Sequence, residues 1–213
     1  MNPLPTATLR NNRGTWLVPV CDLPAVAAVL LDALPAEPFD TGFQGQKLET
    51  IYFDTAALRL RKARRRGERY LTLRLRCYHT ANEPAVYAAS AKTESEKWRQ
   101  EVPAATAELL RQTPSVDVWR AILPGHLQVR LAGLIGEDTL LPVASVLAHR
   151  YAVENEQDRL TLDVDVRTDT GKCLPAAVLE FKSIEGDTPP PGGLTALRLR
   201  PIKLSKFLWA TEV

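Results

Sequence analysis

Charged residues recur two to four positions apart in several stretches where polar and apolar residues alternate. These are Arg74/Arg76, Lys97/Arg99, Arg159/Asp163/Asp165 and Glu180/Lys182. On a β-strand, residues two apart share a face and lie about 7 Å from each other. A further pair, Lys203 and Lys206, has the three-residue spacing of one helix face. Converging Lys and Arg side chains suit an anion with several phosphates, because Arg binds phosphate oxygens bidentately and Lys acts as a compact charge.

Carboxylates among these cations, such as Glu180, would repel a phosphate chain. They make chemical sense as ligands of Mg²⁺ or Mn²⁺, which bridges to phosphate oxygens. Two structural explanations stay open. Each row could be the solvated face of an antiparallel sheet, or the rows could form cross-strand ladders of ion pairs.

The segment 70–77 predicts the clearest strand, with Thr72, Arg74 and Arg76 on one face and leucines on the other. Further strands are predicted at 14–19, 48–55, 85–93, 97–102, 143–153, 159–168 and 176–183. Helices are predicted at 23–34, 104–112, 115–123 and 127–134, and again after Pro201. The basic segment 56–66 is interpreted as a turn or hairpin connection whose tip at 64–66 is solvated. About eight strands in this order predict the α+β class: an eight-stranded antiparallel β-barrel with flanking helices and a closing C-terminal helix.

Length and composition fit one sizeable domain. The chain has 213 residues, 45% of them apolar, and a net charge of +2. We expect a leader at 1–12 and a single domain at 13–213 with a helical insert at about 103–135. No apolar run approaches the roughly 20 residues that span a bilayer, and residues 1–13 lack the apolar core of a signal peptide.

Cysteine and histidine usage predicts a reduced, cytoplasmic protein. Cys21, Cys77 and Cys173 are scattered, and the cysteines and histidines show no metal-ligand spacing. The sequence contains no Ser/His/Asp set, phosphate-binding loop or dinucleotide fingerprint. No nucleic-acid partner is expected, and the oligomeric state is left open.

Six short motifs follow one another in a recognisable order. They are Ile-Tyr-Phe-Asp-Thr at 51–55, Leu-Arg-Leu-Arg-Cys-Tyr at 73–78, Lys-Trp-Arg at 97–99, Arg-Leu-Thr-Leu-Asp at 159–163, Leu-Glu-Phe-Lys at 179–182 and Lys-Leu-Ser-Lys-Phe at 203–207. In this order the sequence resembles the VTC domain, the polyphosphate-polymerase branch of the triphosphate tunnel metalloenzyme (CYTH-like) superfamily. The resemblance covers nearly the whole chain, and Leu-Val-Pro at 17–19 fits the family's first strand.

The resemblance implies a tunnel that takes ATP, triphosphate or polyphosphate together with Mn²⁺ or Mg²⁺. It matches Glu180 to the metal-binding glutamate, Arg74 and Arg76 to the paired tunnel arginines, and Lys203 and Lys206 to the two lysines of the closing helix. These four basic residues are the expected catalytic residues. The substrate ligands, including Arg99 and Lys182 from the charged pairs, are then Arg74, Arg76, Lys92, Lys97, Arg99, Arg150, Arg159, Lys182, Lys203 and Lys206. The favoured reaction transfers the terminal phosphoryl group of ATP to a growing polyphosphate chain. With water as the acceptor, the same site would be an inorganic or nucleoside triphosphatase.

The sequence departs from the family pattern on two strands. Arg13 and Thr15 stand where the family carries Glu-x-Lys, and Ser90 replaces an acid of a later strand that keeps Lys92. Fewer carboxylates then remain to hold a metal ion. A non-catalytic polyphosphate- or nucleotide-binding module is therefore an alternative from a different class, and a plain β-barrel with solvated charges would bind no ligand.

Overall fold

The computed structural model describes residues 11–33, 45–79, 84–112, 116–154, 156–184 and 189–212. The predicted leader therefore lies outside the described residues except for Asn11 and Asn12, which already belong to the first strand. The chain divides into two compact units. Unit 1 takes its residues from Met1–Lys47, Ala148–Arg167 and Cys173–Leu204, and unit 2 from Leu48–Leu147, Thr168–Lys172 and Ser205–Val213.

Nine strands lie in the described part of the chain. They are β1 (Asn11–Val18), β2 (Gln46–Asp54), β3 (Thr72–His79), β4 (Val86–Lys92), β5 (Lys97–Val102), β6 (Leu141–Glu154), β7 (Asp158–Thr168), β8 (Ala177–Ser183) and β9 (Arg200–Pro201). Their hydrogen-bonded order is β5-β4-β3-β2-β6-β7-β8-β1-β9. The predicted α+β class, an antiparallel sheet with flanking helices, is confirmed. The closed eight-stranded barrel is wrong, because the described strands form an open order of nine in which β5 and β9 each have one neighbour.

The helices are η1 (Val20–Asp22), α1 (Leu23–Ala33), α2 (Arg59–Arg66), α3 (Ala104–Gln112), α4 (Val116–Ile122), α5 (Gly125–Ile135), α6 (Gly192–Ala196) and α7 (Lys206–Ala210). Three of them, α3, α4 and α5, fall in the region where the sequence predicts a helical insert. Among the described residues, no helix combines the length and the apolar character needed to cross a membrane.

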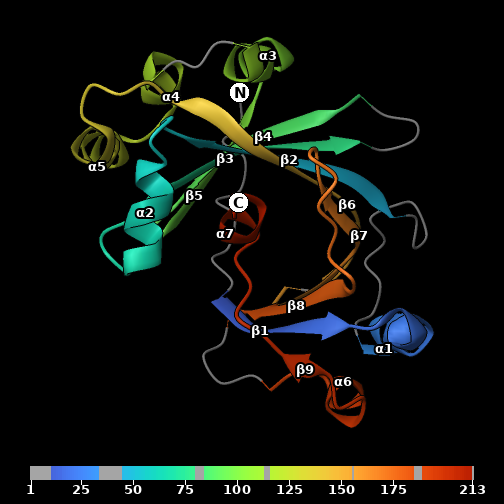
Figure 1. The fold of residues 1–213 in the computed structure, drawn as a ribbon. Helices are drawn as coiled ribbons and strands as arrows, with labels where there is room; N and C mark the ends of the chain where they lie inside the picture. Colours follow the sequence, from blue (N-terminus) through green and yellow to red (C-terminus); the bar gives the residue numbers. More distant parts are fainter. Residues whose placement is uncertain are drawn as a thin grey trace. The chain divides into compact units, whose positions relative to one another are not determined.

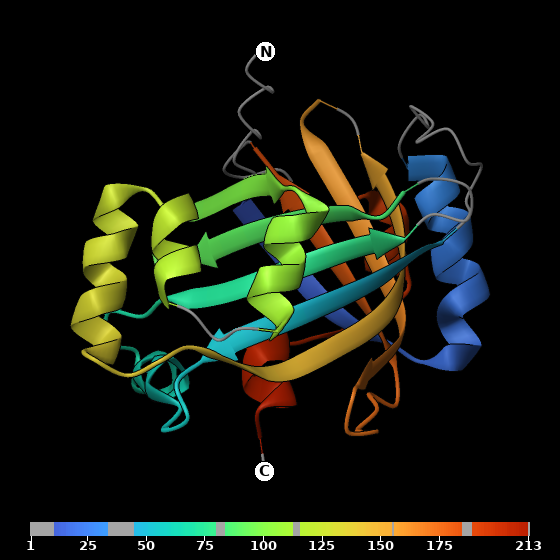
Figure 2. The ribbon, with the colours of Figure 1, turned by 90° about the horizontal axis from the view of Figure 1, so that it is seen from above.

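The leucine face of β3 is the centre of unit 2. Leu73 and Leu75, together with Leu71 just before the strand, are fully buried in one cluster with Trp119 of α4 and Leu131 of α5. Burying each leucine contributes about 2 kcal/mol. Figures 1 and 2 show α3, α4 and α5 on this face of the strands of unit 2, with α7 on the other face. Because side chains alternate along a strand, the arginines of β3 lie on the face away from these three helices.

The basic segment after β2 is a helix, so its interpretation as a hairpin was wrong. Leu60 and Ala63 bury one face of α2. The buried Asp54 carboxylate accepts hydrogen bonds from the N–H groups of Leu60 at 2.9 Å and Arg61 at 2.8 Å. It thereby satisfies two of the amides that the start of a helix leaves unpaired. Burial raises the pKa of Asp54, and these backbone hydrogen bonds oppose that effect.

Unit 1 has its own apolar face, covered by α1 and α6. Leu30 of α1 and Leu194 of α6 belong to one buried cluster with Phe181 of β8. Glu180 and Lys182 alternate with Phe181 along β8 and therefore lie on the opposite face. In each unit, then, the predicted charged rows occupy the sheet face that the apolar cluster leaves.

Lys203 and Lys206 do not share a helix, contrary to the prediction from their spacing. The helix α7 begins at Lys206, and Lys203 lies in the non-helical segment after β9. β9 pairs with β1, and the Ile202 N–H donates to the Thr15 carbonyl at 2.8 Å, which keeps this segment extended. Ser205 then caps α7 with its hydroxyl.

Candidate functional site

A row of polar side chains crosses β3, β4 and β5 on the arginine face of unit 2. Arg74 stands opposite Ser90, and Ser90 stands opposite Arg99. The Arg74 Nε–H donates to the Ser90 hydroxyl at 2.9 Å. Lys92 and Lys97 are directly opposed in the same ladder. Arg74, Arg99, Lys92 and Lys97 therefore place several positive charges on one face of these strands.

Arg76 supplies a hydrogen-bond donor that the described residues leave without an acceptor. Its Nη1 donates to the Tyr78 hydroxyl at 3.4 Å, but its Nε is buried and has no hydrogen-bond partner in the described chain. An unpaired buried donor costs about 1–3 kcal/mol. A phosphate oxygen would provide the missing acceptor.

Tyr78 is a residue of this face that the sequence reasoning missed. The Arg99 guanidinium carbon lies 5.4 Å from the centre of its ring, a cation–π distance. Tyr78 thus contacts both Arg76 and Arg99. The signal was present, because Tyr78 continues the two-residue spacing of Arg74 and Arg76 along the strand.

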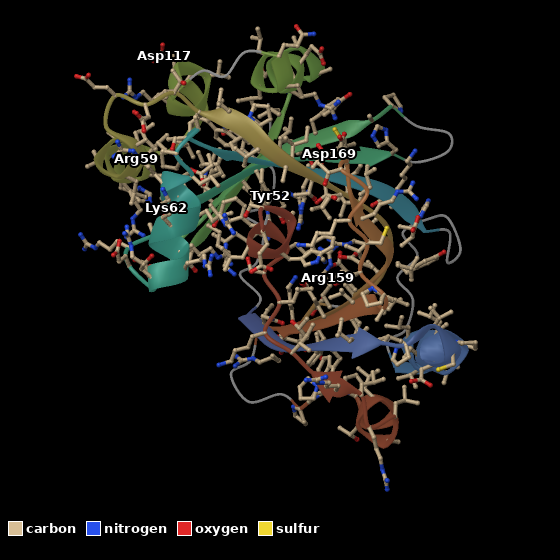
Figure 3. The ribbon with its side chains drawn as sticks, viewed as in Figure 1. Tyr52, Arg59, Lys62, Asp117, Arg159 and Asp169 are labelled. Atoms are coloured by element: carbon tan, nitrogen blue, oxygen red, sulfur yellow. The ribbon has the colours of Figure 1, made fainter. Side chains whose placement is uncertain are left out.

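Arg64 is tied to the sheet, although the sequence placed it at a solvated tip. Its Nη1 donates to the Thr72 hydroxyl at 2.6 Å, and its guanidinium lies 5.0 Å from the centre of the Tyr70 ring. Burial lowers the pKa of Arg64, while Tyr70 and Tyr52 raise it. Two other α2 residues, Arg59 and Lys62, are exposed (Figure 3).

The helix α7 places Lys206 on unit 2. The ring of Phe207 packs against that of Tyr52 of β2, with centroids 5.3 Å apart (Figure 3). Tyr52 and Phe53 are neighbours on this strand, so Tyr52 lies on the face opposite Phe53. Lys172 holds the far end of α7 by donating to the Trp209 carbonyl at 2.9 Å. Lys206 is therefore the first residue of a short, anchored helix.

Unit 1 carries the predicted metal ligand. Glu180 of β8 stands opposite Thr15 of β1 on one side and Thr161 of β7 on the other. Its carboxylate forms an ion pair with Lys182 at 2.7 Å. Arg159 of β7 stands opposite Lys182. Glu180 and Lys182 share a strand face, as their spacing predicted, and the register of β7 and β8 places Arg159 beside Lys182.

Arg150 has a structural partner. Its guanidinium binds both carboxylate oxygens of Asp163, at 2.6 and 2.8 Å, and both side chains are buried. Asp163, a member of the charged row on β7, is therefore paired with Arg150. The role of Arg150 in phosphate binding stays a prediction.

The donors around Glu180 fit a metal ion that is held largely by its substrate. Two neutral hydroxyls, those of Thr15 and Thr161, flank one carboxylate, and the Thr161 hydroxyl is buried without a hydrogen-bond partner among the described residues. Mg²⁺ is commonly bound by one or two carboxylates, with the remaining ligands from substrate phosphates and water. Glu180 therefore fits a cation that arrives with a triphosphate.

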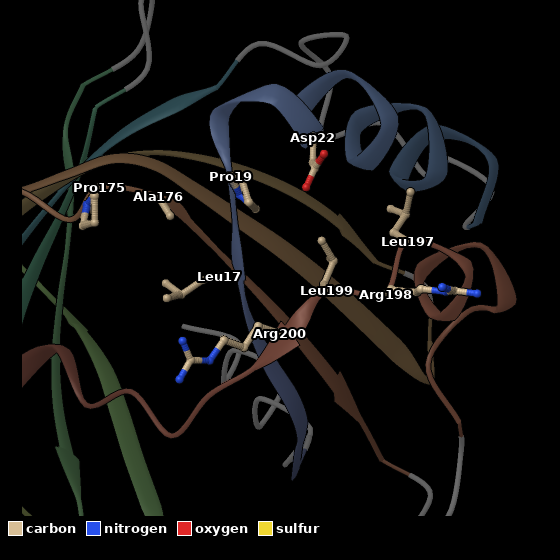
Figure 4. Close-up of a pocket in the computed structure, with 9 residues that line it drawn as sticks. All are labelled: Leu17, Pro19, Asp22, Pro175, Ala176, Leu197, Arg198, Leu199 and Arg200. Atoms are coloured by element: carbon tan, nitrogen blue, oxygen red, sulfur yellow. The ribbon is translucent and has the colours of Figure 1, made fainter.

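A hollow of about 410 Å³ lies elsewhere on unit 1. Figure 4 shows the residues that line it: Leu17, Pro19, Asp22, Pro175, Ala176, Leu197, Arg198, Leu199 and Arg200. None of the predicted site residues is among them, and most of the lining is apolar. This hollow is therefore separate from the charged row on β8.

No protein-family model and no curated protein matches the sequence. The fold is similar to that of a candidate adenylate cyclase from Bacillus halodurans, with a TM-score of 0.61 and 16% identity over 94% of this chain and 96% of the other. It is also similar to that of a candidate adenylyl cyclase from Hippeastrum, described as having a dominant triphosphatase activity. Here the TM-score is 0.57 and the identity 16% over 96% of this chain and 97% of the other.

At this identity the likeness extends to the fold alone. The descriptions of the two structures name cyclase and triphosphatase activities, and neither gives support to the polyphosphate-polymerase branch.

Proposed function

We propose that this protein is an enzyme that hydrolyses the triphosphate group of inorganic triphosphate or of a nucleoside triphosphate, with a divalent cation. The buried Arg76 Nε, which has no acceptor among the described residues, carries the proposal. It lies on the same sheet face as the Arg74, Ser90 and Arg99 row. The fold likeness to a protein described as a triphosphatase supports the same reaction.

The basic residues of the charged rows would bind the phosphate groups. Within unit 2, the proposed phosphate ligands are Arg74, Arg76, Lys92, Lys97, Arg99 and Lys206. Within unit 1, the proposed phosphate ligands are Arg159, Lys182 and Lys203. Arginine suits this task because its fork of donors matches two phosphate oxygens. The positive charges oppose the charge that develops on the leaving phosphate, so catalysis rests on position and electrostatics.

Glu180 is the proposed protein ligand of a Mg²⁺ or Mn²⁺ ion. A bound cation would neutralise phosphate charge and polarise the phosphoryl oxygens. Lys182 holds the Glu180 carboxylate in place at 2.7 Å before the substrate arrives. The flanking Thr15 and Thr161 leave the other coordination positions to phosphate and water.

The proposed reaction transfers the terminal phosphoryl group to water. The water oxygen forms a bond to the terminal phosphorus, and the bond from that phosphorus to the bridging oxygen breaks. Diphosphate or a nucleoside diphosphate leaves with the electron pair, orthophosphate is released, and the water proton passes to solvent. The chain's own residues bind and orient the triphosphate throughout.

A second candidate is a binding module without turnover. The row of Thr15, Glu180 and Thr161 contains a single carboxylate, which is already paired with Lys182. A site with so little negative charge would bind a free divalent cation weakly. Triphosphate would then bind through the cations alone.

The test is phosphate release by the purified chain from tripolyphosphate and from ATP, with Mn²⁺ or Mg²⁺. We expect release that a chelator abolishes. Glu180→Gln should lower kcat about a hundredfold, as the loss of one preorganised charge-stabilising group commonly does. Glu137→Gln, which changes an exposed carboxylate in the turn after α5, should match the wild type.

The products decide between the candidates. Orthophosphate supports the hydrolase. Polyphosphate chains would indicate a polymerase, and a cyclic nucleotide would indicate a cyclase. If either of these were the main product, the proposal would be overturned. Tight triphosphate binding without any product would leave the binding module.

A further inference from the structure

In the described chain, a second group of side chains carries the donors of a metal site and takes no part in the proposed reaction. Glu49 of β2 and Cys77 and His79 of β3 each offer one ligand atom, and these atoms lie within 4.8 Å of one another. Cys77 and His79 are two residues apart, so they share a strand face. That face holds Leu73 and Leu75, opposite the face of Arg74. The group is therefore distinct from the proposed phosphate ligands of unit 2.

A positive charge already contacts two members of this group, Glu49 and Cys77. Arg111 of α3 places Nη2 2.5 Å from a Glu49 carboxylate oxygen and 2.7 Å from the Cys77 sulfur. The Ser145 hydroxyl donates to the other Glu49 oxygen at 3.1 Å, which fixes the carboxylate. Sulfur and carboxylate are thus both directed at one cation, the guanidinium.

The chemistry of the three donors selects the kind of ion. A thiolate, an imidazole and a carboxylate are the side chains that bind Zn²⁺, and three such ligands leave a fourth position for water. A sulfur ligand disfavours Mg²⁺ and Mn²⁺, which prefer oxygen. Cys77 is 1% exposed, whereas His79 is exposed, so the group has an open side at the histidine.

We propose that Glu49, Cys77 and His79 form a site for a thiophilic divalent cation of the Zn²⁺ type, which binds in place of the Arg111 guanidinium. Arg111 moves aside as the ion enters, and the Cys77 thiol gives its proton to solvent as the metal–sulfur bond forms. The arginine is a built-in competitor, because its charge repels the incoming ion. Zinc binding would join β2 and β3 without the substrate ligands Arg74 and Arg76.

The removal of the Arg111 charge tests whether this side chain competes with the metal ion. If Arg111 only supports the positions of Glu49 and Cys77, its removal should weaken metal binding. If it competes with the metal ion, its removal should strengthen metal binding. Arg111→Met keeps most of the volume and deletes the charge. It should tighten Zn²⁺ binding by about tenfold or more. Arg120→Met, on the exposed surface of α4, is the matched control and should leave the affinity unchanged.

The experiment uses the full chain, stripped with a chelator and dialysed, then titrated with Zn²⁺ against a chromophoric competitor and with Co²⁺ in a spectrophotometer. We expect one ion per chain and a sulfur-to-cobalt charge-transfer band. Cys77→Ser should abolish the band, and His79→Ala should weaken Zn²⁺ binding about tenfold or more. Cys21→Ser and Cys173→Ser, which change exposed cysteines, should leave the cobalt band and the Zn²⁺ affinity unchanged.

His79→Ala keeps the test valid if a change at the buried Cys77 prevents folding, because His79 is exposed. A band that persists in Cys77→Ser, an affinity that is indifferent to His79→Ala, or weaker binding by Arg111→Met would each overturn the proposal. Glu180→Gln separates the two metal hypotheses. It should lower phosphate release and leave the Zn²⁺ affinity of the Cys77 site as it is in the wild type.

Discussion

Arg74 and Ser90 stand directly opposite each other on β3 and β4, and the Arg74 Nε–H donates to the Ser90 hydroxyl at 2.9 Å. In the family pattern that the sequence resembles, the position of Ser90 holds an acid. A hydroxyl can orient the guanidinium without neutralising it, whereas a carboxylate would pair with it. With a serine at this position, position 90 places no carboxylate opposite Arg74.

Substitutions at Ser90 test this relationship. Ser90→Ala removes one hydrogen bond worth about 1 kcal/mol, so the Kd for tripolyphosphate should rise about fivefold. Ser90→Glu should weaken binding further, because its carboxylate would neutralise Arg74. Calorimetric titration measures both, with the exposed Ser95→Ala as the control. Wild-type affinity in Ser90→Glu would show that Arg74 does not bind the anion.

The pairing of Thr15 with Glu180 gives a second prediction. The two residues are directly opposed on β1 and β8, and Thr15 is buried. Thr15→Glu places two carboxylates side by side, which repel in the absence of a cation. We expect a lower Tm without metal, a recovery with Mn²⁺, and Mn²⁺ binding about tenfold tighter in the presence of a triphosphate analogue.

Thermal unfolding with and without Mn²⁺ and metal titration measure these effects. Thr170→Glu is the matched control, because Thr170 is exposed in the turn after β7. A Tm of Thr15→Glu that Mn²⁺ fails to raise would argue against a metal at Glu180.

The buried pair of Arg150 and Asp163 gives a third prediction, on stability. Arg150→Ala leaves the Asp163 carboxylate buried without its partner, which should cost about 3–5 kcal/mol of unfolding free energy. Replacing the two together, with Arg150→Met and Asp163→Leu, should recover most of that loss, because apolar side chains need no charge partner. Urea unfolding of the single and double variants measures both.

The control for these unfolding measurements is Arg167→Met, which breaks the exposed pair with Asp165 and should change stability little. A double variant no more stable than Arg150→Ala would contradict the prediction. The Kd of the double variant for tripolyphosphate tests separately whether Arg150 binds phosphate. A rise of about tenfold would support that role.

Local sequence patterns predicted what depends on local chemistry. The alternation at 70–77 predicted β3 and both of its faces, because the period of two is a property of the strand itself. The helices predicted at 104–112, 115–123 and 127–134 likewise follow from local sequence signals. The side of the sheet on which Glu180 lies also follows from alternation along β8.

Contacts distant in sequence were not predictable in this way. The helix α2 starts where it does because Asp54, five residues before its first residue, accepts amide hydrogen bonds from its first turn. Arg111 contacts Glu49 and Cys77, which lie on two other elements and are 62 and 34 positions away in the sequence. Ser90 could be opposed to Arg74 only once the register of β3 and β4 was known. The short β9 is too brief to give a pattern.

The ion pair of Arg130 and Glu94 gives the last prediction, on pH. Arg130 of α5 donates to a Glu94 carboxylate oxygen at 2.7 Å and to the Tyr70 carbonyl at 3.2 Å. The hydrogen bond from Arg130 lowers the pKa of Glu94. A carboxyl whose pKa is lowered on folding adds stability above its unfolded pKa, and that stability is lost as the pH falls through the folded pKa.

The unfolding free energy of the wild type should therefore exceed that of Glu94→Gln near neutral pH, and this difference should vanish in acid. Added salt should shrink it at every pH, because the pair is exposed. Urea unfolding at a series of acidic and neutral pH values measures the difference, and carboxyl NMR of Glu94 with and without Arg130→Gln measures the pKa itself. Arg120→Gln, which breaks an exposed pair with Asp117 on α4, is the control. A difference that grows toward acid would reverse the assigned sign and exclude Arg130 as the cause of the lowered pKa.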